Sequence, residues 1–541
     1  MKNHRSKIKS RSEIIAIIGS RPRHRRVALC HGTFDLVHPG HIRHLEYAKD
    51  HADILIASIT PDEYVTKANF RPYTPAQLRA NNLAVLEMVD YVMIDDAATP
   101  LGTLNAIQPD YFAKGFEYAH GHPKTEEERA VVESYGGEML FTPGDIVQSS
   151  SKIITQSPPN IAVDMLIALM EAEGLSFDDL RAAVHAMATV HVHVIGDTIV
   201  DTITETVPTG GIGKTPTISV HVQGKRDYVG GAGIVAKHVR AAGSSVTFST
   251  VLGNDHNGEF VIDDLSADGI DLNYVIDRDR PTTNKNAIVA GGYRMLKLDT
   301  LDNREIPDKT VNALAADIRE TKADIVIFSD FRHGLFTRNT IPILASAIPV
   351  DALKVADSQV ASRWGNILEF HGFDLITPNE KEARFALGDQ DSVVRPLASR
   401  LYEESACKVL ILKMGEMGIL TQCGAVGEPS YLHVVRSFAR HVTDAVGCGD
   451  ALLAYASLGL AVTKKPVIAS ILGSIAAGLE CEHDGNIPIR FEHVLDRLSE
   501  LEREAQYGPL KESGRSSSAK SGGASMPSIS STAATIVEAR G

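Results

Sequence analysis

The chain has 541 residues, of which 43% are hydrophobic and 23% are charged, and its formal net charge is −14. This length exceeds one ordinary core and predicts two to four domains, while the negative charge argues against a nucleic-acid-binding surface. The five cysteines show neither CxxC nor zinc-ligand spacing, which excludes a disulfide framework and favours a reducing cytoplasm. No apolar run approaches about 18 residues, so we expect no membrane span.

The first unit is predicted from alternating strand-like and helix-like segments between residues 25 and 155. Residues 1–24 form a basic extension whose apolar run, Ile14–Ile18, is too short for a signal sequence and is expected to be a short helix. The expected strands are Val27–Cys30, Ile54–Ile59, Tyr91–Ile94, Tyr111–Ala113 and Glu138–Phe141, and the expected helices are 40–49, 75–89 and 126–135. Such alternation predicts an α/β domain, a parallel sheet with helices on both faces.

A second, longer α/β unit is predicted over residues 191–500. The Pro-containing segment Ser157–Asn160 interrupts the first pattern, and residues 156–190 are expected to form a helical connector with helices at 161–170 and 177–190. The second unit begins with a strand at Val192–Ile195, and three β-rich pieces, 217–222, 247–251 and 286–297, are expected to form a small lid sheet. The tail, 501–541, is rich in Ser, Gly and Ala and is expected to be disordered.

The stretch HGTFDLVHPGH contains the first candidate site. His38 and His41 follow a buried strand and lie on one face of a helix that begins near Pro39-Gly40. Free N–H groups and the dipole at a helix start favour anions, and two imidazoles there can stabilise charge on an α-phosphate under attack. Two purely structural histidines are the alternative. Zinc binding is disfavoured because no third ligand is evident.

The same stretch resembles the HxGH signature of the cytidylyltransferase-like nucleotidyltransferases, and the resemblance extends over about residues 25–155, which implies a Rossmann-like fold. It implies catalytic roles for His38, His41 and Lys152, and substrate contacts from Lys67 and Arg79. It also implies nucleotide contacts from Thr33, Phe34, Lys114, Gly115, Ser149, Ser150 and Ser151. Taken alone, the pattern SSSK is more typical of an ordinary helix N-cap, and its position after the other motifs favours the phosphate-binding role.

The stretch DAVGCGD contains the second candidate site. Gly447, Cys448 and Gly449 can direct successive N–H groups into one anion-binding concavity. Asp450 would then lie in the first turn of a helix, either as a plain cap or as a general base for a hydroxyl beside the transferred phosphate. The pattern lacks the Lys-Ser/Thr of a Walker loop. We interpret Cys448 as a tolerated small residue rather than a nucleophile.

DAVGCGD resembles the GAGD motif of the ribokinase-like carbohydrate kinases, and this resemblance covers about residues 191–498. It implies Asp450 as the base, a nucleotide site with Gly447, Cys448, Gly449, Lys413 and Gly415, and Mg²⁺ organised by Asn379 and Glu382. It implies a sugar site built from Asp197, Asp201, Gly230, Gly231 and Lys285. Family members carry Asn four residues after the first Gly of the GG motif, where this chain has Ile234, and Ile cannot bond a sugar hydroxyl.

The combination of the two halves resembles bifunctional heptose-phosphate kinases/heptose-1-phosphate adenylyltransferases, but with reversed domain order. It implies an Mg²⁺-dependent, homodimeric cytoplasmic enzyme that acts on a sugar phosphate and a nucleoside triphosphate (ATP, or CTP or GTP for nucleotidyl transfer) and produces an ADP-heptose type of product for surface polysaccharide. One alternative is a cytidylyltransferase for a polyol phosphate fused to a kinase of other or lost specificity. Another is a non-enzymatic sugar-phosphate sensor. A dinucleotide-dependent oxidoreductase is disfavoured because neither half has GxGxxG after its first strand.

Overall fold

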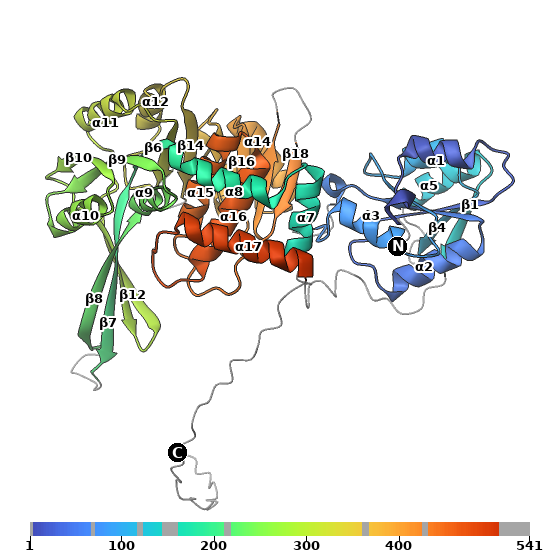
Figure 1. Cartoon of the computed structure of the whole chain (residues 1–541), viewed down its shortest axis with the longest axis horizontal. Coiled ribbons are helices and arrows are strands. Elements are labelled where there is room, and N and C mark those ends of the chain that lie inside the picture. Colours follow the sequence, from blue (N-terminus) through green and yellow to red (C-terminus); the bar gives the residue numbers. More distant parts are fainter. Residues whose placement is uncertain are drawn as a thin grey trace, which may run out of the picture.

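A computed structural model describes residues 4–65, 71–115, 123–142, 161–209, 218–359, 367–424 and 431–507. It contains two α/β units, seen at opposite ends of Figure 1, and a band of long strands that extends from the second unit. Residues 501–507 of the tail that was expected to be disordered instead continue the C-terminal helix Phe491–Tyr507, and residues 508–541 lie outside the described residues. Within the described part, no helix combines the length and the apolar character needed to cross a bilayer.

The first unit is a five-stranded parallel sheet, as predicted. Its strand order is β3-β2-β1-β4-β5, and every neighbouring pair is parallel. The strands are β1 (Val27–Gly32), β2 (Ile54–Ile59), β3 (Tyr91–Ile94), β4 (Tyr111–Gly115) and β5 (Glu138–Thr142). The connecting helices are α2 (Pro39–Asp50), α3 (Ala76–Ala84), α4 (Leu101–Ile107) and α5 (Pro123–Ser134). Because the strand order reverses between β1 and β4, ligands are expected at the carboxyl ends of these two strands.

The basic N-terminal segment forms the expected short helix, α1 (Arg11–Ile18), which begins with a capping box at Ser10 and Glu13. The helix belongs to the core of the first unit, because Ile14 and Ile18 are buried in one cluster with residues of β1 and β4.

The connector contains the two expected helices, α7 (Ala162–Ala172) and α8 (Phe177–Ala186). Their apolar faces pack into the main core of the second unit, next to the C-terminal helix α17 (Phe491–Tyr507). The connector is therefore part of the second unit.

The second unit is a nine-stranded sheet of order β10-β9-β6-β13-β14-β15-β16-β17-β18. Its strands are β6 (His191–Gly196), β9 (Ser245–Gly253), β10 (Asp271–Asp277), β13 (Ile325–Asp330), β14 (Leu353–Ser358), β15 (Leu375–Ile376), β16 (Val409–Lys413), β17 (Ile419–Cys423) and β18 (Tyr431–Val435). Neighbouring strands are parallel except for the pairs β16–β17 and β17–β18, so β17 alone runs against the other strands of this sheet. Its helices are α9 (Ala232–Ala241), α10 (His256–Ala267), α11 (Asp308–Glu320), α12 (Thr340–Ser346), α13 (Glu380–Leu387), α14 (Val394–Ser405), α15 (Cys448–Thr463) and α16 (Pro466–Cys481).

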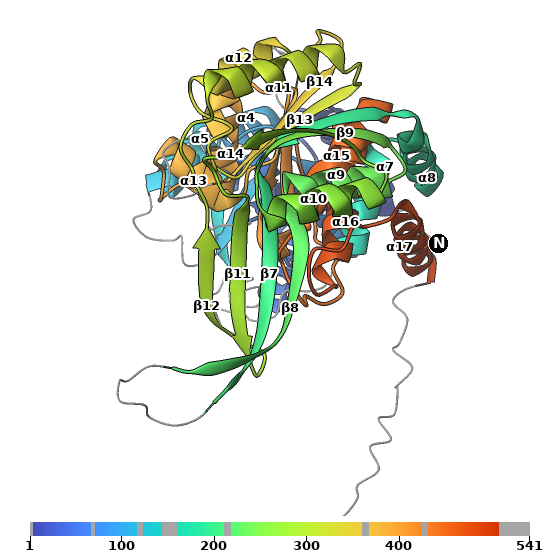
Figure 2. The ribbon, with the colours of Figure 1, turned by 90° about the vertical axis from the view of Figure 1, so that its left-hand side faces the viewer.

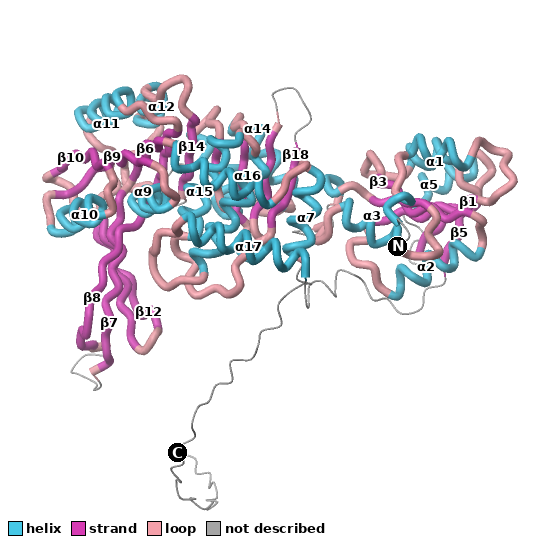
Figure 3. The backbone as a smooth tube through the Cα atoms, in the orientation of Figure 1, coloured by secondary structure: helices cyan, strands magenta, loops and turns pink. Residues whose placement is uncertain are grey.

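A separate four-stranded sheet forms the expected lid, with strand order β12-β11-β7-β8. These strands are β7 (Thr198–Pro208), β8 (Val220–Gly231), β11 (Thr283–Ala290) and β12 (Tyr293–Thr300). Figure 2 shows them side by side, and Figure 3 shows the band extending beyond the helices.

One lid expectation is wrong. Residues 247–251 lie in β9, which pairs with β6 in the main sheet. Phe248, Ser249 and Thr250 are fully buried, so this strand is covered on both faces, as central strands of parallel sheets are. Local sequence predicted a strand here but not the sheet that it joins.

Candidate active sites

The two histidines of the first site lie together at the start of α2. His38 is the N-cap residue, and its Nδ1 accepts a hydrogen bond from the Gly40 N–H at 3.1 Å. In the neutral ring the proton is therefore on Nε2. The His41 ring stacks on His38 with centroids 4.0 Å apart, and its Nδ1 lies 3.2 Å from the Leu36 carbonyl oxygen, to which it donates. The spacing predicted this geometry, and the catalytic role remains a prediction.

Burial controls the charge of this pair. It lowers the pKa of His41 to about 4, and the neighbouring His38 and His44 add to the effect. Burial also lowers the pKa of His38, followed by the effect of Arg43. The rings are therefore neutral near pH 7 when no phosphate is bound, and a bound triphosphate would shift both toward the protonated, donating form.

Arg79 occupies a different position from the expected substrate-facing one. Its side chain is fully buried. It donates to the carbonyls of Thr33, Thr74 and Thr60 and pairs with Asp62 at 2.5 Å. All of its nitrogens thus have partners inside the protein, as a buried charge requires. Through these contacts Arg79 holds the Thr33 segment in place.

The other predicted nucleotide contacts of the first unit are only partly described. Phe34 adopts φ 48°, and its ring centroid lies 5.1 Å from that of His41. Lys114, just before Gly115 at the end of β4, pairs with the buried Glu128 of α5. Five predicted residues lie outside the described part of the chain: Lys67, Ser149, Ser150, Ser151 and Lys152.

The second site is a cleft of about 880 Å³ between the lid and the carboxyl ends of the main sheet. The predicted residues that line it come from both sheets and from the start of α15. They are Asp201, Gly231, Lys285, Asn379, Glu382, Lys413, Gly415, Gly447, Cys448, Gly449 and Asp450.

Asp450 lies in a cluster of carboxylates around one lysine. Burial raises its pKa to about 8, and the nearby Asp357 adds to the rise while Lys413 opposes it. Lys413 Nζ donates to Asp357 Oδ1 at 2.9 Å. Burial alone would lower the pKa of Lys413, but Asp357 and Glu382 outweigh that effect and raise it. Asp450 is therefore a carboxyl group whose proton affinity suits exchange with a hydroxyl near neutral pH.

The glycines before Asp450 form the predicted turn at the mouth of α15. Gly447 is the N-cap residue with φ 85°, in the left-handed region that favours glycine. A Cβ atom on it would lie 2.9 Å from Glu480 Oε1 and 3.0 Å from Asn486 Oδ1. The Lys413 ammonium lies against Gly449, 3.2 Å from the position of a Cβ atom there. Backbone amides and an ammonium thus face the same end of the cleft, a suitable arrangement for phosphate.

Asn379 and Glu382 form a reciprocal capping box at the start of α13. The Asn379 side chain accepts from the Glu382 N–H at 2.9 Å, and Glu382 Oε2 accepts from the Asn379 N–H at 2.7 Å. Burial raises the pKa of Glu382 to about 7. Among the described residues, no group of three His, Cys, Asp or Glu side chains is already placed around a metal position. The oxygen donors Asn379, Glu382 and Asp357 nevertheless match the preference of Mg²⁺, which retains waters and binds substrate phosphates.

The lid contributes a charged pair to the opposite wall. Parallel pairing of β7 and β11 places Asp201 beside Lys285. Burial raises the pKa of Asp201 and lowers that of Lys285. A Cβ atom on Gly230 would lie 2.1 Å from Asp201 Oδ2, so glycine leaves the space that this carboxylate occupies.

Asp197 lies beside the cleft without lining it. Its carboxylate accepts from the backbone N–H groups of Phe331, His333 and Leu335 at 3.0, 3.1 and 3.4 Å. It therefore holds the loop after β13, and this differs from the predicted sugar contact. Ile234 is also not in the cleft wall, because its side chain is 1% exposed within α9.

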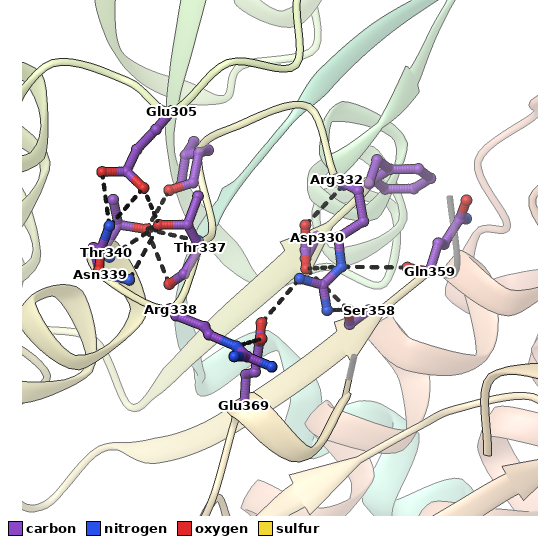
Figure 4. A network of polar contacts seen from close by, with 12 residues as sticks. Glu305, Asp330, Arg332, Thr337, Arg338, Asn339, Thr340, Ser358, Gln359 and Glu369 are labelled. Atoms are coloured by element: carbon purple, nitrogen blue, oxygen red, sulfur yellow. Dashed lines mark hydrogen bonds and ion pairs between the residues drawn. The ribbon is translucent and has the colours of Figure 1, made fainter. Parts of the chain in front are cut away.

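The loop after β13 is fixed by a buried ionic network, shown in Figure 4. Arg332 has φ 63° and lies 3.0 Å from Asp330, 3.1 Å from Glu369 and 2.8 Å from the Ser358 hydroxyl. The network joins the ends of β13 and β14, and the neighbouring Gln359 lines the cleft. Arg332 therefore holds this part of the kinase cleft wall in position.

The cleft also contains residues beyond the predicted set, among them Asp357 and Asn486. Asp357 ends a parallel strand, a position from which the rule for strand ends could have found it. Asn486 comes from the loop after α16. Glu480, at the end of that helix, lies beside Gly447 without lining the cleft. Asn486 Nδ2 donates to Asp201 Oδ2 at 3.1 Å, and no local pattern indicates this contact.

Comparisons with known proteins agree with this division of the chain. The pfkB family carbohydrate kinase model matches residues 190–490, more than half of the chain, and the cytidylyltransferase-like model matches residues 29–156. These matches confirm both predicted family resemblances, the two-unit α/β fold class and the order of the units.

Curated relatives include proteins named bifunctional protein HldE. The one from Desulfatibacillum aliphaticivorans is 28% identical over 354 residues, which cover 63% of this chain and 70% of that protein. The one from Geobacter metallireducens is 30% identical over 261 residues, 46% of this chain and 51% of that protein, so the chain spans about half of this relative. Among solved structures, phosphofructokinase-2 from Escherichia coli has a TM-score of 0.49 at 16% identity, covering 58% of this chain and 100% of that one. The chain belongs to the pfkB family of carbohydrate kinases, with a cytidylyltransferase-like domain ahead of its kinase domain.

Proposed function

We propose that the chain is a bifunctional enzyme that phosphorylates a sugar phosphate and transfers a nucleotide to a sugar 1-phosphate, with ADP-heptose as the type of product. The observation that carries the kinase half is the placement of Asp450. It lies at the amide-lined mouth of α15, in a cleft whose other wall holds Asp201 and Lys285. The heptose and adenine assignments rest on the sequence resemblance, and the relatives named HldE support the pairing of two activities.

In the kinase step, Asp450 accepts the proton of the anomeric hydroxyl. The hydroxyl oxygen attacks the γ-phosphorus of ATP in line, and ADP leaves. The amides of Gly447–Gly449 and the Lys413 ammonium stabilise charge on the transferred phosphoryl group. Mg²⁺ would neutralise phosphate charge when bound, and the oxygens of Asn379 and Glu382 would hold it through its waters.

The lid wall orients the sugar. Asp201 accepts from sugar hydroxyls, and Lys285 attracts the phosphate already on the sugar, because the two side chains are neighbours on β7 and β11. Asn486 supplies an amide to the same pocket, since it contacts Asp201 from the loop after α16. The sugar site therefore retains an amide side chain, although position 234 holds Ile where family members carry Asn.

In the nucleotidyl transfer step, an oxygen of the sugar 1-phosphate attacks the α-phosphorus of the nucleoside triphosphate, and pyrophosphate leaves. His38 and His41 donate to the phosphate oxygens, aided by the free N–H groups at the start of α2. Lys152 and the serines at 149–151 are proposed to bind the leaving phosphates.

The experiment measures the two products separately in the full chain with heptose 7-phosphate or heptose 1-phosphate and ATP. Asp450→Asn should lower bisphosphate formation by about 100-fold or more and leave pyrophosphate release intact. His41→Ala should have the opposite effect. Loss of both activities in either variant would contradict two independent sites, and turnover with CTP and a polyol phosphate in place of these substrates would favour the alternative function.

A further inference from the structure

A second cavity of about 320 Å³ lies at the seam between the two units. We call it the seam cavity. Its walls are the segment leading into α3, one face of α7, the start of α14 and the edge strand β18 with Arg436. None of the described residues that were assigned to either catalytic site lines it.

The charged groups of the seam cavity are mostly guanidinium groups. Among the residues that the structure describes, Arg71, Arg395 and Arg436 line it together with one carboxylate, Asp62. Asp62 is already paired with Arg79 at 2.5 Å. The rest of the wall is largely apolar and includes Val65, Ile94, Met165, Leu169, Leu432 and Val434. The cavity therefore combines excess positive charge with surfaces suited to an apolar or planar group.

Arg395 has unused donors. It makes no hydrogen bond or ion pair with any residue that the structure describes. Burial lowers its pKa, and the more distant charges of Asp62 and Glu63 only partly oppose that effect. Guanidinium groups in such surroundings normally have anionic partners.

Arg436 is held in position and keeps one donor unused. It is 8% exposed, and its guanidinium lies 4.1 Å over the Tyr73 ring of the first unit. Its Nη2 donates to the Tyr73 carbonyl at 3.2 Å, whereas its Nε is buried and has no partner in the described part of the chain. His433 in the same wall adds no charge near pH 7, because burial lowers its pKa to about 3.

We propose that the seam cavity binds a small phosphate monoester carried on a planar or apolar group, with the phosphate between Arg395 and Arg436. The planar fork of arginine suits phosphate oxygens. The volume is near the lower limit of small-molecule pockets, which begin at about 300 Å³. This favours a molecule the size of a nucleoside monophosphate over a nucleotide sugar.

The seam cavity contacts the supports of both catalytic sites. Arg71 is paired at 2.7 Å with Asp35, which belongs to the loop between β1 and the two histidines. On the other side, the Arg436 carbonyl accepts from the Ser474 hydroxyl at 2.9 Å, and Ser474 lines the kinase cleft. A ligand in the seam cavity would therefore change the Michaelis constants of both reactions.

Calorimetric titration of the full chain with AMP tests the proposal through its variants, because AMP can also enter the two nucleotide sites proposed above. We expect one of the binding events to be weakened by at least about tenfold in Arg395→Ala. The matched control is Arg400→Ala on the same helix, where Arg400 pairs with the exposed Glu404, and this variant should bind normally. Adenosine should bind at least about tenfold more weakly than AMP, because it lacks the anionic group.

A second variant, Ala168→Phe on α7, fills the cavity without removing a charge. It should also abolish the AMP binding that Arg395→Ala weakens. The melting temperature and both activities, measured without AMP, should stay near those of the unmodified chain. The proposal is overturned if folded Arg395→Ala and Ala168→Phe proteins bind AMP as the unmodified chain does, or if adenosine binds equally well. Because binding is read directly, inactivity of either catalytic site would not affect this result.

Discussion

Arg294 Nη2 lies 2.9 Å from Asp444 Oδ2 and so joins the outermost lid strand, β12, to the loop that precedes α15. The lid and the phosphate end of the kinase cleft are therefore linked by one exposed ion pair. Exposed pairs contribute up to about 1 kcal/mol, enough to shift lid closure without deciding whether the protein folds.

Arg294→Ala should raise the KM of the kinase reaction about two- to fivefold, because a released lid closes less often over the sugar. Steady-state kinetics at low and high salt would measure this, and high salt should reduce the difference. The matched control is Arg226→Ala, which removes another exposed lid pair, with Glu205, and should leave KM unchanged. Equal effects of the two variants would contradict a specific closing role for Arg294.

The pH dependence of the kinase follows from Asp450. Its pKa is raised to about 8 by burial and then by Asp357, and only the carboxylate form accepts a proton. We expect kcat/KM for phosphorylation to rise with pH up to about 8 and to fall tenfold per unit below it. Pyrophosphate release by the first unit should not show this decrease below pH 8. A kinase profile that is flat from pH 6 to 9 would exclude Asp450 as the base.

The same pKa has an effect on stability. A folded-state pKa above the ordinary value means that the native state holds a proton that the unfolded chain has lost. The protonated Asp450 therefore contributes its full stabilisation below the ordinary pKa of an aspartate, and this contribution is lost as pH rises through about 8. Asp450→Asn, which cannot ionise, should have a higher melting temperature than the unmodified chain above pH 8.

The histidine site should depend on the glycine between the two rings. A Cβ atom on Gly40 would lie 2.9 Å from His38 Cε1 and 3.0 Å from its Nδ1. Gly40→Ala should therefore displace the His38 ring and lower pyrophosphate release by about tenfold or more, with kinase turnover unchanged. Gly102, whose added Cβ atom would meet nothing within 4 Å, provides the control substitution in α4.

Much of this arrangement is predictable from sequence because its signals are local. Alternating strands and helices, the histidine pair at a helix start and the glycine turn before Asp450 each depend on a few neighbouring residues. Residues 247–251 were assigned to the wrong sheet, because a short buried strand does not specify its partner strand. Asn486 was missed for a related reason, since its contact with Asp201 spans 285 residues of sequence.

Asn486 gives a test of the sugar pocket. Removing its amide deprives Asp201 of a donor that lies 3.1 Å away. We expect Asn486→Ala to raise the KM for the sugar phosphate about tenfold while changing kcat less, because hydrogen bonds to charged groups contribute about 1.5–3 kcal/mol. Asn339→Ala, which removes an exposed amide that bonds Glu305, is the control. An unchanged KM in Asn486→Ala would remove this residue from the pocket.

Arg332 gives a test of stability. Its side chain is 1% exposed between Asp330 and Glu369, so Arg332→Ala would leave a buried carboxylate without its partner. We expect the free energy of unfolding of the kinase unit to fall by about 3 kcal/mol, measured by urea denaturation. Arg338→Ala, which removes the exposed partner of the same Glu369, should cost about 1 kcal/mol or less. Equal losses would show that burial does not determine the contribution of this network.

The position of β18 affects how the chain can be divided. It is the last strand of the nine-stranded sheet, and the first unit and α7 lie next to it around the seam cavity. A kinase fragment cut at residue 190 would leave this row of backbone donors and acceptors open to pairing with other molecules, a common origin of aggregation. A fragment that begins at residue 161 would keep α7 over the strand and should remain monodisperse at higher concentration.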